Sequence, residues 1–184
     1  MNGLRKGTFI ECGAYDGETA SNTLSLEREY GWSGYLIEPN PNLYGYVIRK
    51  NRNVTSLNAC ISTDSKEILV NVLAAGQGSK ITDQGAGAFR VPCFTFSSIM
   101  SAFKLQSIDY FSLDVEGFEL AVLKTIPFDA YDIKTMSIEY KHSPGGKKPI
   151  LDFMLSKNYS LLADIKLTER FRALYVEDLI FMKN

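Results

Sequence analysis

Short apolar runs and amphipathic stretches alternate along nearly the whole chain. Apolar runs typical of β-strands lie at residues 8–12, 34–38, 54–62, 108–114, 133–140, 159–164 and 173–182. Helical spacing of apolar residues lies between several of them, at residues 18–30, 39–48, 117–126 and 149–157. Alternation of this kind predicts an α/β fold, with a mostly parallel sheet and helices on both faces. Ligands of such sheets bind outside the carboxyl ends of the strands, where the strand order reverses.

The middle of the chain follows this pattern less closely. Residues 68–73 and 88–94 are expected to pair as a hairpin, and residues 97–103 are expected to form a short helix. The segment between the hairpin strands, residues 76–87, contains four glycines. We interpret it as a substrate lid or as an ordinary hairpin tip, and we expect it to be mobile because ordering glycine is entropically costly.

Length and charge restrict the class of protein. A chain of 184 residues is expected to form one domain, residues 1–184. The formal net charge of −1 gives no basic face for nucleic acid. No apolar run approaches the roughly 18 residues of a membrane span, and no leader-like segment precedes the first strand. We therefore expect a soluble, cytoplasmic protein of undetermined oligomeric state.

Cysteine and histidine are too few for a zinc site of the usual kind. The chain has three cysteines, no Cys-x-x-Cys pair and one histidine. Cys12, Cys60 and Cys93 each lie at the end of an apolar segment. We therefore predict that each is a small buried apolar side chain.

The expected strand ends are mostly acidic. The residues concerned are Glu11, Asp16, Glu38, Asp114, Glu116 and Glu139. Gly13 and Gly17 allow a tight turn after the first strand, and Glu38 stands where a carboxylate can bind both ribose hydroxyls. This pattern indicates a nucleoside-containing cofactor. Because the acidic turn would repel a pyrophosphate, it favours cationic S-adenosylmethionine over a nicotinamide dinucleotide.

The chain also resembles a known family. The segments FIECGAYDGETASNT, GYLIEPNPNLY and IDYFSLDVEGFELAVLKTIPF resemble the FkbM-type methyltransferase domain, most closely its Star-like invertebrate branch. The resemblance covers almost the whole chain, and Asp-Val-Glu-Gly after a hydrophobic strand is its most specific element. It implies a class I, Rossmann-like methyltransferase fold with a seven-stranded sheet, whose last strand runs antiparallel in a terminal hairpin.

The resemblance also implies positions for the cofactor. It places five residues around the methionine part of S-adenosylmethionine: Glu11, Gly13, Ala14, Asp16 and Gly17. It places Glu38 at the ribose hydroxyls and Pro39 beside the adenine. Ala59 and Cys60 would offer backbone groups and an apolar surface to the adenine ring. Asp114 would lie near the ammonium group or the acceptor.

Asp114, Glu139 and His142 are the candidate catalytic residues. Neighbouring parallel strands would bring Asp114 and Glu139 together, and His142 follows Glu139 by three residues. The three side chains could hold a divalent cation, or His142 or Asp114 could act as a general base. Alternatively, Glu139 and His142 only pair with each other at the rim.

Two classes of function remain open from the sequence. The first is methyl transfer from S-adenosylmethionine, most simply to a hydroxyl oxygen of a small molecule or carbohydrate. The second is a non-catalytic Star-like binding or trafficking module that retains the methyltransferase fold. A nicotinamide-dependent oxidoreductase is a distant third, because of the acidic turn.

Overall fold

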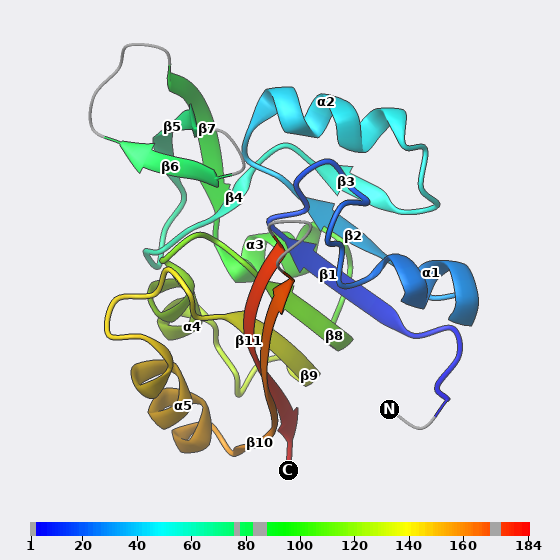
Figure 1. Cartoon of the computed structure of the whole chain (residues 1–184), viewed down its shortest axis with the longest axis vertical. Coiled ribbons are helices and arrows are strands. Elements are labelled where there is room, and N and C mark those ends of the chain that lie inside the picture. The colour runs from blue at the N-terminus through cyan, green and yellow to red at the C-terminus, as the bar shows by residue number, and fades with distance from the viewer. Residues whose placement is uncertain (1–2, 76–77, 83–87, 170–173) are drawn as a thin grey trace.

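A seven-stranded sheet forms the centre of the molecule (Figure 1), seen in a computed structural model that describes residues 3–75, 78–82, 88–169 and 174–184. Its strands, in chain order, are β1 (Thr8–Cys12), β2 (Ser33–Ile37), β3 (Thr55–Leu57), β8 (Ser107–Leu113), β9 (Asp132–Glu139), β10 (Tyr159–Glu169) and β11 (Leu174–Lys183). The spatial order is β10-β11-β9-β8-β1-β2-β3, and only β11 runs antiparallel to the rest. This topology confirms the expected class I methyltransferase fold with its antiparallel terminal hairpin.

Helices cover both faces of this sheet. On one face, α1 (Leu24–Tyr30) and α2 (Pro41–Arg49) pack over a small cluster that includes Phe9 and Leu36. On the other face lie α3 (Phe96–Ala102), α4 (Glu119–Thr125) and α5 (Lys147–Ser156), over the larger core. Successive residues of β1, Phe9 and Ile10, enter different clusters because strand side chains alternate between faces.

The first two helices begin later than predicted. The helix expected from residue 18 begins at Leu24, and it ends at Gly31, in the left-handed region, as predicted. The next helix has Asn40 as its N-cap, so the proline of its first turn is Pro41 and not Pro39. Ile48, expected on the buried face of that helix, is 54% exposed.

The predicted strand at 54–62 is two strands in two sheets. β3 belongs to the central sheet, whereas β4 (Cys60–Ile61) belongs to a second sheet. The amide of Asn58, between them, donates to the carbonyl oxygens of Glu38 and Pro39 at 2.8 and 3.1 Å. This side chain holds the chain at the end of β2 and interrupts the strand.

The second sheet has the order β4-β7-β5-β6 and includes β5 (Ile68–Ala75), β6 (Gly78–Thr82) and β7 (Ala88–Phe94). Antiparallel pairing of β5 with β7 confirms the predicted pairing of these two strands. They do not form a hairpin, because β6, which was not predicted, lies between them in sequence and pairs with the other side of β5. Of the glycine-rich segment interpreted as a lid, residues 76–77 and 83–87 lie outside the described residues.

Cys60 and Cys93 form a disulfide bond between the paired strands β4 and β7. The prediction of a small buried apolar side chain is confirmed for Cys12, a free thiol, and for Cys93, whereas Cys60 is only partly buried. The disulfide was not predicted. The reason is register, because the pairing of the two strands sets Cys60 directly beside Cys93. Disulfides are rare in the cytosol, so this bond weighs against the predicted cytoplasmic location, which stays a prediction.

Among the described residues, every helix is too short or too polar to span a membrane.

Candidate functional site

The turn after β1 packs directly against the end of β8. Gly13 has a φ of +82°, and a Cβ atom there would lie 2.0 Å from the carbonyl oxygen of Asp114. The backbone N–H groups of Gly13 and Ala14 both donate to the carbonyl of Ile37, at the end of β2. Gly13 is therefore required by the contact between neighbouring strand ends, as well as by the turn itself.

Glu38 directly follows β2, at the edge of the sheet formed by the carboxyl ends of the parallel strands, and it is almost completely buried. Its Oε2 accepts the backbone N–H of Tyr15 at 2.9 Å, and its Oε1 accepts that of Asn40 at 2.8 Å. Desolvation raises the pKa of Glu38 to about 7 despite these bonds. Each carboxylate oxygen has two lone pairs, so one on each oxygen remains available to a hydroxyl donor.

The segment predicted to face adenine lies beside Glu38. The backbone N–H of Glu38 donates to the carbonyl of Leu57, and Asn58 fixes the carbonyls of Glu38 and Pro39. Ala59 is fully buried, and the sulfur of Cys60 belongs to the disulfide. Asn58 thus ties the chain that leads to Ala59 and Cys60 to the backbone of Glu38 and Pro39, and the contact of these residues with adenine stays a prediction.

The carboxylate of Glu11 is engaged inside the protein. Its Oε2 accepts the hydroxyl groups of Ser21, at 2.8 Å, and Thr23, and its Oε1 accepts the backbone N–H of Asn22 at 3.0 Å. Desolvation raises the pKa of Glu11, although these donors oppose the shift. Glu11 therefore holds residues 21–23 against the end of β1.

Asp16 has a similar local role in the same turn. Its Oδ1 accepts the backbone N–H groups of Glu18 and Thr19 at 2.9 and 2.7 Å. Burial raises the pKa of Asp16, but the hydrogen bonds outweigh this effect and lower its pKa overall. Gly17, with a φ of +88°, lies against the backbone of Val47 in α2, so the turn is packed from both sides.

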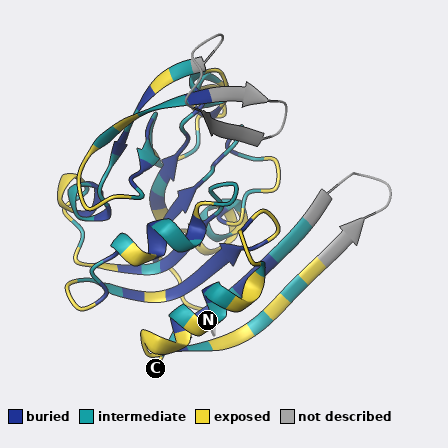
Figure 2. Cartoon of the chain, turned by 90° about the vertical axis from the view of Figure 1, so that its left-hand side faces the viewer, coloured by how far each residue is buried: buried dark blue, intermediate teal, exposed yellow. Residues whose placement is uncertain are grey.

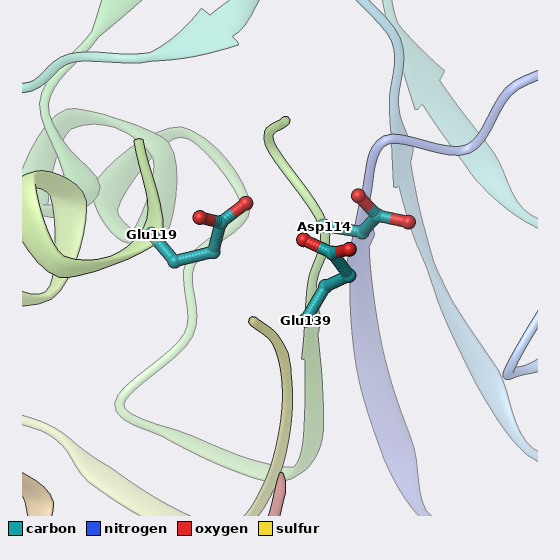
Figure 3. A group of neighbouring side chains, drawn as sticks. All are labelled: Asp114, Glu119 and Glu139. Carbon is teal, nitrogen blue, oxygen red and sulfur yellow. The ribbon is translucent and has the colours of Figure 1, made fainter. Parts of the chain in front are cut away.

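Three carboxylates meet at the other half of this edge (Figure 3), and we refer to Asp114, Glu119 and Glu139 as the acid cluster. One oxygen from each lies within 4.8 Å of the others, a spacing that could hold a metal ion. Desolvation and neighbouring carboxylates raise the pKa of Asp114 to about 7 and that of Glu139 to about 8. Asp114 and Glu139 are therefore partly protonated at neutral pH.

Glu119 was not predicted from the sequence. It is fully buried in the first turn of α4, where it accepts the backbone N–H groups of Val115 and Gly117 and the hydroxyl of Ser143. Gly117, with a φ of +101°, would place a Cβ atom 2.8 Å from the carbonyl of His142. Glu119 therefore joins the loop after β8 to the loop after β9. Its place two residues after a glycine that opens a helix is the only signal that could have found it.

Asp178 was also missed. It pairs in register with Glu139, because the antiparallel direction of β11 brings the middle of that strand to the carboxyl ends of the others. Burial raises the pKa of Asp178, and the side chain of Asn22 donates a hydrogen bond to it. Finding it would have required the strand pairing as well as the strand itself.

His142 lies at the rim of the acid cluster. Its Nδ1 is 2.9 Å from Glu116 Oε2 and 3.4 Å from Glu139 Oε1, and 45% of the side chain is exposed. Asp114 and Glu139 come together as predicted. The third carboxylate beside them is Glu119, whereas His142 pairs with Glu139, as the alternative interpretation expected, and with Glu116.

A separate groove of about 360 Å³ lies beside the terminal hairpin. Its lining residues are Tyr140, Lys141, Gly146, Lys147, Asp164, Lys166 and Glu177. Tyr140 and Glu177 directly neighbour Glu139 and Asp178 in sequence, so strand alternation directs them to the other face of the sheet. Lys147 pairs with Asp164, and Lys166 pairs with Glu177. The groove is therefore distinct from the acid cluster.

Comparisons with known proteins agree with this architecture. Residues 11–161 match the family model described as the methyltransferase FkbM domain. The structure is similar to a methyltransferase FkbM from Methylobacillus flagellatus KT, with a TM-score of 0.65 and 13% identity over 96% of this chain. This chain spans only 43% of the length of that protein. Among curated proteins, none matches significantly.

Two further solved structures share the fold at low identity. One is magnesium protoporphyrin IX methyltransferase from Synechocystis PCC 6803 with bound SAM, at a TM-score of 0.54 and 13% identity, covering 100% of this chain and 72% of that one. The other is precorrin-6y C5,15-methyltransferase from Geobacter metallireducens GS-15, at a TM-score of 0.55 and 11% identity, covering 98% and 81%. Their names give different acceptors, so the shared fold leaves the acceptor open.

Proposed function

Because this chain belongs to the FkbM methyltransferase domain family, we propose that it binds S-adenosylmethionine at the ends of β1, β2 and β8 and transfers a methyl group from it. The observation that carries the proposal is Glu38, a buried carboxylate with acceptor capacity directed at the turn after β1. We further propose that the chain belongs to the Star-like branch, on the segments quoted above.

The chemistry of the edge fits this cofactor. The compact turn consists of Gly13, Ala14, Asp16 and Gly17. We keep Glu11 in the site as the residue that accepts the backbone N–H of Asn22 and so holds the segment after the turn. We keep Pro39, Ala59 and Cys60 as the residues proposed to lie beside the adenine. The carboxylates of Asp114 and Glu139 suit a sulfonium and an ammonium and would repel a pyrophosphate, which disfavours the nicotinamide alternative.

We propose a hydroxyl oxygen of a small molecule or carbohydrate as the acceptor. When bound, S-adenosylmethionine supplies an electrophilic methyl group on sulfur. Asp114 or His142 would accept the hydroxyl proton, because an unassisted hydroxyl is a poor nucleophile at neutral pH. The acceptor oxygen would bond to the methyl carbon as the bond from that carbon to sulfur breaks, and S-adenosylhomocysteine would be the leaving group. A carboxyl group with a pKa of about 7 matches this task near neutral pH. The acidic edge also disfavours a nucleic-acid acceptor, whose phosphates it would repel.

A divalent cation is the second form of this mechanism. The spacing of the acid cluster favours it, since three carboxylate oxygens lie within 4.8 Å of one another. Held by Asp114 and Glu139, with His142 at the rim, a cation would acidify the acceptor hydroxyl in place of a general base. The non-catalytic Star-like binding or trafficking alternative has no support in the fold or the comparisons.

Calorimetric titration with S-adenosylmethionine and S-adenosylhomocysteine tests cofactor binding. Loss of two charge-assisted hydrogen bonds in Glu38→Ala should cost about 2–4 kcal/mol of affinity. Glu29→Ala, which removes an exposed carboxylate from α1, is the matched control and should bind as wild type does. Absence of wild-type binding at millimolar ligand contradicts the proposal, and binding of NADH would favour an oxidoreductase.

Single Ala variants of Asp114, Glu139 and His142 test the chemistry. Turnover is measured as S-adenosylhomocysteine formed with a panel of sugars and hydroxylated small molecules, with and without chelator. Lost turnover with retained cofactor binding supports a catalytic cluster, and chelator sensitivity selects the cation. Asp152→Ala, an exposed carboxylate on α5, is the control. Unchanged turnover in all three variants would remove the catalytic assignment.

A further inference from the structure

Arg52 is a buried cation beside the turn that follows β1. It lies in the link between α2 and β3, and its side chain is only 2% exposed. The guanidinium carbon lies 5.9 Å from the centre of the Phe9 ring, on the α1/α2 face of the sheet. Burial of a permanently charged group is costly unless it is fully paired, so its partners identify its role.

The hydrogen-bond partners of Arg52 lie on α1 and on the segment 17–23 that precedes it. Nε donates to Glu27 of α1 at 2.6 Å, and Nη1 donates to the carbonyl oxygen of Gly17 at 2.6 Å. Nη1 and Nη2 also donate to the hydroxyl oxygens of Ser21 and Thr23, at 3.0 and 3.1 Å. A planar guanidinium can serve these directions at once, whereas an ammonium on a single stem cannot.

The hydroxyls of Ser21 and Thr23 bridge two opposite charges. Each donates its proton to Glu11 and accepts from Arg52, and Arg52 Nη1 lies 3.9 Å from Glu11 Oε2. The segment 17–23 is thus held between the carboxylate of Glu11 on β1 and the guanidinium of Arg52, which lies in the link after α2. Each hydroxyl therefore has both a donor and an acceptor partner, which fixes its orientation as well as its position.

This hydrogen-bonded arrangement extends through Asn22 to Ser112 and Asp178, which lie next to the acid cluster. The backbone N–H of Asn22 donates to Glu11, and its side-chain amide donates to Ser112 of β8 at 3.0 Å. The same side chain donates to Asp178, the register partner of Glu139. A displacement of residues 17–23 would therefore move a donor away from the acidic edge.

We propose that Arg52 is a positioning residue that fixes the segment 17–23 and so aligns the cofactor turn with the acidic edge. The effect on cofactor affinity rests on the function proposed above, whereas the effect on the segment itself does not. Arg52 touches no reacting atom in this account, and it acts through Gly17, Ser21 and Thr23.

The experiment compares Arg52→Met, which keeps the apolar stem, with wild type. Amide hydrogen exchange of residues 17–23 should accelerate about tenfold or more, while exchange in α5 should change little. Affinity for S-adenosylhomocysteine should fall about tenfold or more. Arg49→Met is the matched control, since Arg49 is the exposed arginine at the end of α2.

Two further variants separate positioning from general stability. Met154→Ala removes a buried side chain of α5, far from the turn, and should lower stability without weakening S-adenosylhomocysteine binding. In Arg52→Ala, millimolar guanidinium should restore affinity where sodium at equal ionic strength does not. Arg52→Lys keeps the charge without the planar fork, so it should recover only part of the affinity, and it replaces Arg52→Met if that variant does not fold.

The outcomes are distinct. Uniform acceleration of exchange across the molecule, or full recovery by Arg52→Lys, would overturn the positioning role. If wild type binds no S-adenosylhomocysteine, the proposed function fails, and the exchange pattern of residues 17–23 still decides the role of Arg52.

Discussion

The two halves of the carboxyl end of the sheet, the turn after β1 and the acid cluster, differ in how their carboxylates are paired. In the turn after β1, Glu11 and Asp16 each accept several hydrogen bonds, and their nearest opposite charges are Arg52 and Lys50. At the ends of β8 and β9, the charged groups that shift the pKa of Asp114 and Glu139 are other carboxylates. The contacts of Glu139 with His142 are long, at 3.5 Å from the backbone N–H to Oε2 and 3.4 Å from Nδ1 to Oε1.

The two regions therefore differ in how far their negative charge is balanced. In the turn after β1, hydrogen bonds and the nearby cations Arg52 and Lys50 balance the carboxylates. The acid cluster concentrates negative charge that a proton or a cationic ligand must balance, and its raised pKa values express that need. Perturbed carboxylates of this kind are common where chemistry takes place.

The largest expected effect comes from Gly13→Ala, which acts where the two halves touch. A Cβ atom 2.0 Å from the carbonyl of Asp114, added to an unfavourable positive φ, should cost about 3–5 kcal/mol of unfolding free energy. Gly31→Ala has a similar φ and no atom within 4 Å, so it should cost only about 1 kcal/mol. Urea denaturation measures both, and equal losses would show that the contact with Asp114 does not matter.

A smaller effect should appear in the pH dependence of stability. Because the folded pKa of Glu139, about 8, exceeds its unfolded value, its protonated form favours folding. That contribution is full below about pH 4 and disappears as pH rises towards 8. Glu139→Gln should therefore stabilise the ligand-free protein at pH 8, by about 1–2 kcal/mol, or roughly 3–6 °C.

The comparison of pH 5 with pH 8 isolates this term. Asp152→Asn, on the exposed side of α5, should show no such change between the two pH values in thermal melts. A Glu139→Gln protein with the wild-type pH slope would mean that the acid cluster is not electrostatically strained.

The smallest expected effect is in the turn after β1. Asp16→Ala removes the acceptor of two backbone N–H groups and should cost about 1 kcal/mol of unfolding free energy. Asp16→Asn keeps one acceptor oxygen and should lose less. Denaturant titration distinguishes the two variants. If Asp16→Ala loses as much unfolding free energy as Gly13→Ala, the two halves do not differ as described.

The parts of the site that could be predicted from sequence are those set by local pattern. Strand ends are local, so Glu38, Asp114 and Glu139 were found, and the parallel sheet placed the latter two together. The start of α1 was placed too early because Asp16 and Glu11 draw the backbone N–H groups of residues 18, 19 and 22 out of a helix. Helical spacing alone does not show that competition.

The parts that could not be predicted depend on contacts distant in sequence. Arg52 lies in a short link, and its partners are 25 to 35 residues earlier in the chain. Asp178 joins the site only through the pairing of β11 with β9, and Cys60 meets Cys93 only through the pairing of β4 with β7. The last two contacts need the register of strands, which composition and periodicity leave undetermined.

The Cys60–Cys93 bond also has a topological consequence. The chain leaves the central sheet after β3, forms the second sheet and returns to α3, and the bond joins the start of that excursion to its end. One backbone cut between these cysteines would therefore leave the two fragments covalently joined, with β1 to β3 on one and β8 to β11 on the other. The intervening residues could be nicked, exchanged or extended while the halves that carry Glu38 and Asp114 remain a single molecule.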